Sequence, residues 1–186
     1  MARFPKIWFL RHGQTEWNLE GRIQGQLNSN LTDTGRAHAA AQAKLMAPII
    51  DDILDAGGRI FVSPQGRAME TAHIALKGYP FQTDARLAEI KTGEWEGCLR
   101  SEVCPEISGL EAYCAAPGGE GFEALHARVE AFLGSLQTPT VLVSHGILGQ
   151  VLRGTVRNLN RKDIADLSND QGCVYVLENG TEEVLR

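Results

Sequence analysis

Short apolar runs alternate along this chain with longer segments of helical periodicity, and this alternation constrains the fold more than any other feature. Runs rich in β-branched and aromatic residues, which are typical of strands, occur at 6–10, 59–63 and 140–143. Strands separated by helices favour a parallel sheet with helices on both faces. We therefore expect an α/β fold, a three-layer α/β/α sandwich around a mostly parallel central sheet.

Helices are expected between these strands and after the last of them. Thr32 is a good N-cap for a helix that begins near Asp33 and ends near Pro48. Three further helices are predicted by helical spacing, at 64–77, 122–136 and 147–158. In the first of these, Ser63 is placed to act as the N-cap and Pro64 as the first helical residue.

Two segments depart from the alternation. Residues 80–118 are rich in Gly and Pro, which predicts irregular structure with a short helix near 110–115. Near the end of the sequence, strand-like runs at 173–177 and 183–185 flank an Asn-Gly pair, a strong hairpin signal. The sandwich is therefore expected to carry an antiparallel hairpin at one edge.

The composition excludes several classes of protein. The 186 residues are 43% hydrophobic and 22% charged, as in an ordinary globular chain, so we expect one domain over residues 1–186. The net charge is −5 and no Lys/Arg run occurs, which argues against a nucleic-acid partner. The sequence offers no stretch of about 18 apolar residues, no signal-peptide pattern and no CxxC pair. We expect a cytoplasmic protein without a membrane partner; its oligomeric state stays open.

Cationic side chains and histidines follow three of the predicted strands. Arg11 and His12 come directly after the first strand, Arg67 lies four residues beyond the second, and His145 and Gly146 follow the third. Because ligands of parallel α/β folds bind beyond the carboxyl ends of the strands, we expect these residues to meet. In an acidic chain, such a cluster indicates an anionic ligand, most simply a phosphate.

Each of these residues has a simpler explanation when it is taken alone. Arg67 could be a solvated helix residue, and His145 could be a histidine satisfied by a nearby carbonyl. The combination is more specific, because Arg binds phosphate oxygens bidentately and a neutral imidazole is a competent nucleophile toward phosphorus. Nearby guanidinium groups also lower the pKa of an imidazole and keep it neutral.

An ordered series of segments resembles the histidine phosphatase superfamily, also called the phosphoglycerate mutase-like family. The series begins with Arg11–Asn18 (RHGQTEWN) and ends with Val143–Gly146 (VSHG). Between them lie matching segments at 21–25, 31–35, 63–72, 87–89 and 93–97. The resemblance covers most of the chain, in the expected order, and implies a phosphomonoester phosphatase of a small phosphorylated metabolite.

The resemblance implies a role for each site residue. His12 is expected to be the nucleophile that becomes a phosphohistidine, and Glu89 to be the general acid and base. Arg11, Arg67 and His145 are expected to hold the phosphoryl oxygens during catalysis. The expected substrate-binding residues are Arg11, Asn18, Arg67, His145 and Gly146. Neither a metal nor an organic cofactor is expected.

Three alternatives remain open at this point. A bisphosphoglycerate-dependent phosphoglycerate mutase is the nearest, but the run Glu89–Gly93 (EIKTG) lacks the Arg and Tyr that mutases of this family carry there. A non-catalytic phospho-ligand binder would need none of the catalytic residues, and all of them are present. A metallohydrolase could use His12, His145 and Glu89 as ligands. The physiological phosphomonoester and any regulatory role are not predicted.

Overall fold

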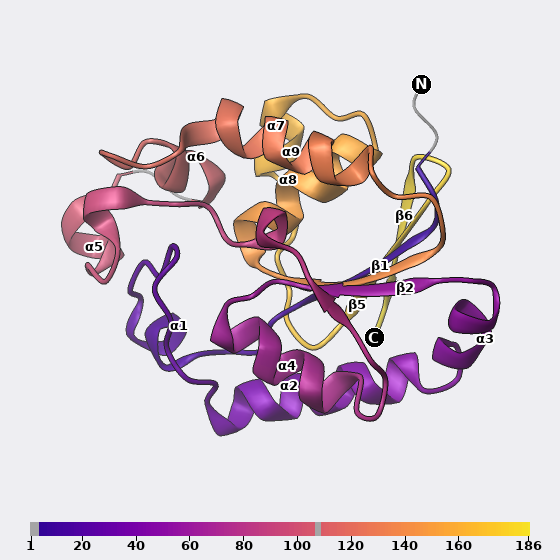
Figure 1. The fold of residues 1–186 in the computed structure, drawn as a ribbon. Helices are drawn as coiled ribbons and strands as arrows, with labels where there is room; N and C mark the ends of the chain where they lie inside the picture. Colours follow the sequence, from indigo (N-terminus) through magenta and orange to yellow (C-terminus); the bar gives the residue numbers. More distant parts are fainter. Residues whose placement is uncertain (1–3, 107–108) are drawn as a thin grey trace.

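The computed structural model describes residues 4–106 and 109–186 (Figure 1). Its six-stranded sheet has the order β3-β2-β4-β1-β5-β6. The strands are β1 (Ile7–Arg11), β2 (Arg59–Val62), β3 (Gln82–Thr83), β4 (Thr140–Ser144), β5 (Val174–Glu178) and β6 (Thr181–Leu185). The first four are parallel, whereas β5 and β6 pair antiparallel at one edge. The predicted mostly parallel sheet with an edge hairpin is confirmed.

Helices cover both faces of the sheet (Figure 1). One face packs against α2 (Asp33–Met46), α3 (Ile50–Asp55) and α4 (Gly66–Ala75). The other packs against α6 (Gly109–Cys114), α7 (Gly121–Leu133), α8 (Gly146–Val156) and α9 (Arg161–Ala165). The period of two along β1 explains the division, since Trp8 points into the first layer and Phe9 into the second. This is the predicted three-layer sandwich.

Shorter elements lie in the connections. They are α1 (Glu16–Glu20), α5 (Arg100–Val103) and the 3₁₀ turns η1 (Ala85–Leu87) and η2 (Gly93–Trp95). The segment predicted to be irregular therefore contains β3, two 3₁₀ turns and α5, besides the helix expected near 110–115. None of the helices described between residues 4 and 186 combines the length and apolarity that crossing a bilayer requires.

The register between the central strands positions the site. In the parallel pair of β1 and β4, Ile7 lies opposite Thr140 and Arg11 lies opposite Ser144. The amide of His12 continues this ladder by donating to the carbonyl of Ser144 at 2.9 Å. The residues that follow β1 and β4 therefore leave the sheet side by side.

One helix start differs from its prediction. Thr32 caps α2 as expected, accepting from the amide of Gly35, but α4 begins at Gly66 rather than at Pro64. Gln65 rather than Ser63 is therefore the N-cap of α4, and the Ser63 hydroxyl lies 2.7 Å from Nε2 of His145. A tertiary contact thus replaces the local cap that the sequence suggests.

Candidate active site

The carboxyl ends of β1, β2 and β4 lead into a cavity of about 200 Å³. Six of the seven predicted site residues line it: Arg11, His12, Asn18, Arg67, Glu89 and Gly146. The seventh, His145, is fully buried beside His12, with 5.2 Å between the two ring centroids. The structure therefore brings all the predicted residues together.

A larger cavity, of about 780 Å³, lies at the other end of the strands, where Pro5 precedes β1 and Asn179 follows β5. None of the predicted site residues lines it. Chemistry rather than size therefore identifies the candidate site.

The His12 imidazole is held in one orientation. Its Nδ1 lies 2.7 Å from the carbonyl oxygen of Gly13, which can only accept, so Nδ1 carries the proton and Nε2 keeps a free lone pair. Burial lowers the pKa of His12 well below 6.5, and the charges of Arg67 and Arg11 lower it further. A neutral imidazole with a free Nε2 is the form that a nucleophile needs.

Two guanidinium groups, those of the buried Arg67 and the half-buried Arg11, face the same cavity. Arg67 is 1% exposed and donates to the carbonyls of Leu27 (2.6 Å) and Gly25 (2.9 Å), while Arg11 donates to the carbonyl of Asn169. In the described part of the chain, neither forms a salt bridge, and the Nε of each has no hydrogen-bond partner. Burial lowers the pKa of Arg67 to about 10, so the group stays cationic at neutral pH. Buried cations without carboxylate partners indicate a site for an anion.

His145 supplies a further unsatisfied polar atom. Its Nε2 bonds to the Ser63 hydroxyl, whereas its buried Nδ1 has no partner among the residues described. The Ser63 hydroxyl also accepts from the amide of Gln65, at 3.3 Å, so its own proton is available for Nε2. With the Ser63 hydroxyl as the donor to Nε2, the His145 proton lies on Nδ1. Burial lowers the pKa of His145 well below 6.5, with Arg67 as the next cause, so the ring is a neutral donor.

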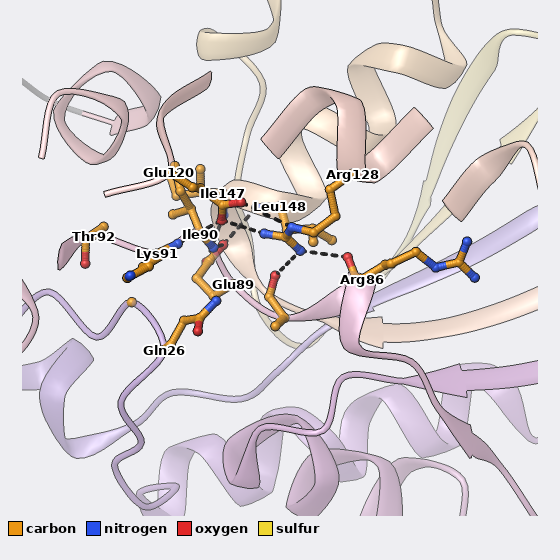
Figure 2. Close-up of polar contacts among 12 residues, drawn as sticks. Gln26, Arg86, Glu89, Ile90, Lys91, Thr92, Glu120, Arg128, Ile147 and Leu148 are labelled. Carbon is orange, nitrogen blue, oxygen red and sulfur yellow. Dashed lines mark hydrogen bonds and ion pairs between the residues drawn. The ribbon is translucent and has the colours of Figure 1, made fainter. Parts of the chain in front are cut away.

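The Glu89 carboxylate lies at the first turn of α8 (Figure 2). Its Oε1 accepts from the amides of Ile90 and Leu148, both at 2.9 Å, and its Oε2 accepts from the amide of Ile147 at 3.1 Å. The positive end of the α8 dipole favours a carboxylate in this position. Glu89 is 6% exposed, so it is not the solvated loop residue that a lone Glu usually is.

Two smaller predictions concern Asn18 and Gly146. The Asn18 side chain lines the cavity while its Oδ1 accepts from the amide of Thr15, in the capping box of α1. A Cβ at Gly146 would lie 2.6 Å from Nδ2 of Asn169 and 3.2 Å from the guanidinium carbon of Arg11. Glycine at position 146 therefore lets Arg11 cross close to the start of α8.

Sequence reasoning missed several residues of the cavity wall. They include Gln24, Arg100, Tyr113, Gln150 and Asn169. Arg100, Tyr113 and Gln150 lie on α5, α6 and α8, whereas Gln24 and Asn169 lie in loops. No spacing in the sequence relates these residues to one another. Among the described residues, no three His, Cys, Asp or Glu side chains gather into a group that could hold a metal ion.

Comparisons with known proteins agree with this geometry. Residues 7–184 match the histidine phosphatase superfamily (branch 1). The chain is 33% identical over 181 residues to a glucosyl-3-phosphoglycerate phosphatase of Mycolicibacterium vanbaalenii, covering 84% of this chain and 76% of that protein. It is 32% identical over 168 residues to the probable phosphoglycerate mutase GpmB of Salmonella paratyphi C, covering 83% and 75%.

A solved structure extends the comparison to the fold. The crystal structure of the alpha-ribazole phosphatase from Shigella flexneri matches with a TM-score of 0.77 and 26% identity, covering 97% of this chain and 94% of that one. The family match spans nearly the whole chain and includes all the residues that line the cavity. The chain therefore belongs to branch 1 of the histidine phosphatase superfamily.

Proposed function

We propose that this chain is a metal-independent phosphatase that hydrolyses a small phosphomonoester through a phosphohistidine on His12. Family membership and similarity to named phosphatases support phosphoric monoester hydrolysis. The observation that carries the proposal is the pair of guanidinium groups with buried, unpartnered Nε atoms and no carboxylate partners, beside an imidazole held neutral with a free Nε2. A cytoplasmic location and a single domain over residues 1–186 are part of the same proposal.

In the first step, Nε2 of His12 attacks phosphorus; the N–P bond forms as the bond to the ester oxygen breaks. The unpartnered Nε atoms of Arg11 and Arg67 and the Nδ1 of His145 can donate to the phosphoryl oxygens. Phosphoryl transfer depends mainly on positioning and on stabilisation of charge. Fixed donors in a buried site supply both without a metal ion.

Glu89 is the proposed proton donor to the departing oxygen. In the second step it accepts a proton from the water that attacks the phosphohistidine, which releases phosphate and restores His12. Its Oε1 already accepts two amide hydrogen bonds and its Oε2 accepts only one. We therefore assign the exchanged proton to Oε2, the oxygen with a lone pair to spare.

The experiment that tests the proposal traps the intermediate. Brief incubation with labelled substrate, without added metal, is expected to leave an acid-labile, base-stable phosphoramidate on the protein. His12→Ala is expected to abolish both the labelling and the turnover. Labelling that persists in His12→Ala would show that another residue is the nucleophile.

The mutase is the second candidate, because GpmB relatives are named probable phosphoglycerate mutases. The run from Glu89 to Gly93, which lacks the Arg and Tyr of mutases, favours hydrolysis instead. A panel of phosphosugars, phosphoglycerate-like acids, ribazole phosphate and phosphoproteins, assayed for phosphate release, is expected to identify the substrate class. Transfer of phosphate between positions of a phosphoglycerate, without release, would favour the mutase.

A further inference from the structure

We propose that Arg128 and Glu120 are positioning residues that hold Glu89 in place for its proton transfers. They act on the backbone on both sides of Glu89, and Figure 2 shows this arrangement. The inference rests on the proposed function, in which Glu89 is the general acid and base.

The Arg128 side chain, from α7, holds the backbone before Glu89. Its Nη1 donates to the carbonyls of Arg86 and Ala88, both at 2.7 Å. These carbonyls lie three residues and one residue ahead of Glu89. Two hydrogen bonds from one charged nitrogen therefore fix the chain where it approaches the carboxylate.

Glu120, just before α7, holds the backbone after Glu89. Its Oε1 accepts from the amide of Lys91 at 2.9 Å, and its own amide donates to the Lys91 carbonyl at 3.0 Å. The carboxylate also pairs bidentately with Arg128, with Nη2 to Oε1 at 2.6 Å and Nε to Oε2 at 3.2 Å. One ion pair thus links the two contacts into a single unit.

The segment around Glu89 needs such support because regular structure does not supply it. The turn η1 ends at Leu87 and η2 begins at Gly93, so Glu89 lies in neither a helix nor a strand. Of the three amides that donate to its carboxylate, two belong to α8, a different element. A shift of about 1 Å in a catalytic group can slow a reaction roughly 10²-fold, so the placement of this segment matters for the rate.

The pair is placed to act on position rather than on substrate. Neither Arg128 nor Glu120 is among the residues that line the cavity, and their side chains are 19% and 17% exposed. The positive charge of Arg128 and the negative charge of Glu120 neutralise each other in this ion pair. Loss of the pair is therefore expected to affect the step that needs Glu89 and to leave substrate binding nearly unchanged.

The test measures single-turnover formation of phosphohistidine from an alkyl phosphate and from an activated aryl phosphate. Arg128→Met is expected to slow the alkyl reaction by about 10-fold or more, within the roughly 10²-fold cost of a misplaced group. The aryl reaction, whose leaving group needs little protonation, is expected to slow much less. Arg128→Lys and Glu120→Gln are expected to show the same substrate dependence, and they carry the test if Arg128→Met fails to fold.

A double-mutant cycle separates positioning from a general loss of structure. In the Glu89→Gln background, Arg128→Met is expected to cause little further loss with the alkyl phosphate, because the group it positions is gone. The matched control is Arg161→Met, which removes another bidentate Arg–Glu pair, that of Arg161 with Glu111. This control is expected to keep the parental rates.

Several results would overturn the proposal. They are unchanged rates in all three variants, equal losses for both substrates, and an undiminished effect of Arg128→Met in the Glu89→Gln background. Failure of the proposed function is distinguishable, since Glu89→Gln alone would then show no dependence on the leaving group, or no phosphohistidine would form in the parent chain.

Discussion

At the scale of single residues, the candidate site is defined by donors that the fold leaves unsatisfied. Nε of Arg11, Nε of Arg67 and Nδ1 of His145 are buried, and within the described ranges none has a partner. A buried donor without a partner costs about 1–3 kcal/mol. In the proposed phosphate site, an oxyanion that accepts from all three atoms would remove this cost.

Substitution of Arg67 tests the contribution of one of these unsatisfied donors. Arg67→Met is expected to lower kcat/KM by about 10²–10³-fold, the usual effect of losing one preorganised donor. Arg67→Lys is expected to recover little, because a single ammonium cannot bond both loop carbonyls and still present a fork to phosphate. Steady-state kinetics with an aryl phosphate measure the loss.

The control for Arg67 is Arg36→Met, which removes an arginine that is 47% exposed on α2. It is expected to leave kcat/KM unchanged. The Gly25 and Leu27 carbonyls lose their donor in Arg67→Met, so the rates are measured well below its melting temperature. Near-normal activity in Arg67→Met would mean that this guanidinium only holds the loop.

Glu89→Gln tests the proton donor. Single-turnover phosphorylation by an alkyl phosphate is expected to slow by roughly 10²–10⁴-fold, the usual contribution of general acid–base catalysis, and the aryl reaction by clearly less. Glu96→Gln is the comparison, because Glu96 accepts from the amides of Gln26 and Thr92 and is assigned no proton transfer. Equal losses for both substrates in Glu89→Gln would shift the role to Glu94 or Glu96.

At the scale of elements, the start of α8 organises the site. His145 is its N-cap, Gly146 its first residue, and the amides of Ile147 and Leu148 bind the Glu89 carboxylate. One helix start therefore holds the proposed acid and the histidine proposed to bind phosphate at adjacent positions. The geometry at this turn is tight, because Arg11 and Asn169 lie directly against Gly146.

Gly146→Ala tests that tight approach. The added Cβ would lie 2.6 Å from Asn169 Nδ2, so Asn169 or Arg11 has to move. We expect kcat/KM to fall by about 10-fold or more, since small displacements of a positioning group are costly. Gly134→Ala, at the end of α7, is the control, because its Cβ would meet only the Glu130 carbonyl, at 3.3 Å. Equal effects of the two substitutions would place the cost in helix packing rather than in the site.

At the scale of the whole molecule, folding places two histidines where they cannot easily accept a proton. Burial, followed by the nearby guanidinium charges, lowers the pKa values of His12 and His145 well below 6.5. The unfolded chain therefore binds more protons than the native chain once the pH falls through about 6.5. By linkage, the stabilisation that neutral histidines allow is present above that pH and is lost below it.

The free energy of unfolding is accordingly expected to fall as the pH decreases from about 7.5 to about 5. Denaturant titrations at several pH values measure the slope. His12→Gln removes one of the two groups. We expect it to make the dependence of the unfolding free energy on pH shallower, by an amount that corresponds to at most one bound proton. Identical slopes for His12→Gln and the parent chain would show that His12 titrates alike in both states.

Local patterns account for what the sequence alone determined. The alternation of strands and helices follows from hydrophobic periodicity, the edge hairpin from Asn179 and Gly180, and the start of α2 from Thr32. The placement of Arg11, His12, Arg67 and His145 at one edge follows from parallel topology, because parallel strands end together. Shorter elements such as α1, α3, α9 and β3 were missed, since a few residues carry too little periodicity to be recognised.

Contacts between distant segments were decided only by the tertiary structure. The Ser63 hydroxyl serves His145, 82 residues away, instead of capping α4, and Arg11 is held by the carbonyl of Asn169, 158 residues away. The same holds for the contacts of Glu89 with α8. Such contacts depend on how helices pack across the sheet, which no local periodicity encodes. The sequence thus identified the chemical groups of the candidate site, and the packing of the layers determined which of their atoms remain without a partner among the described residues.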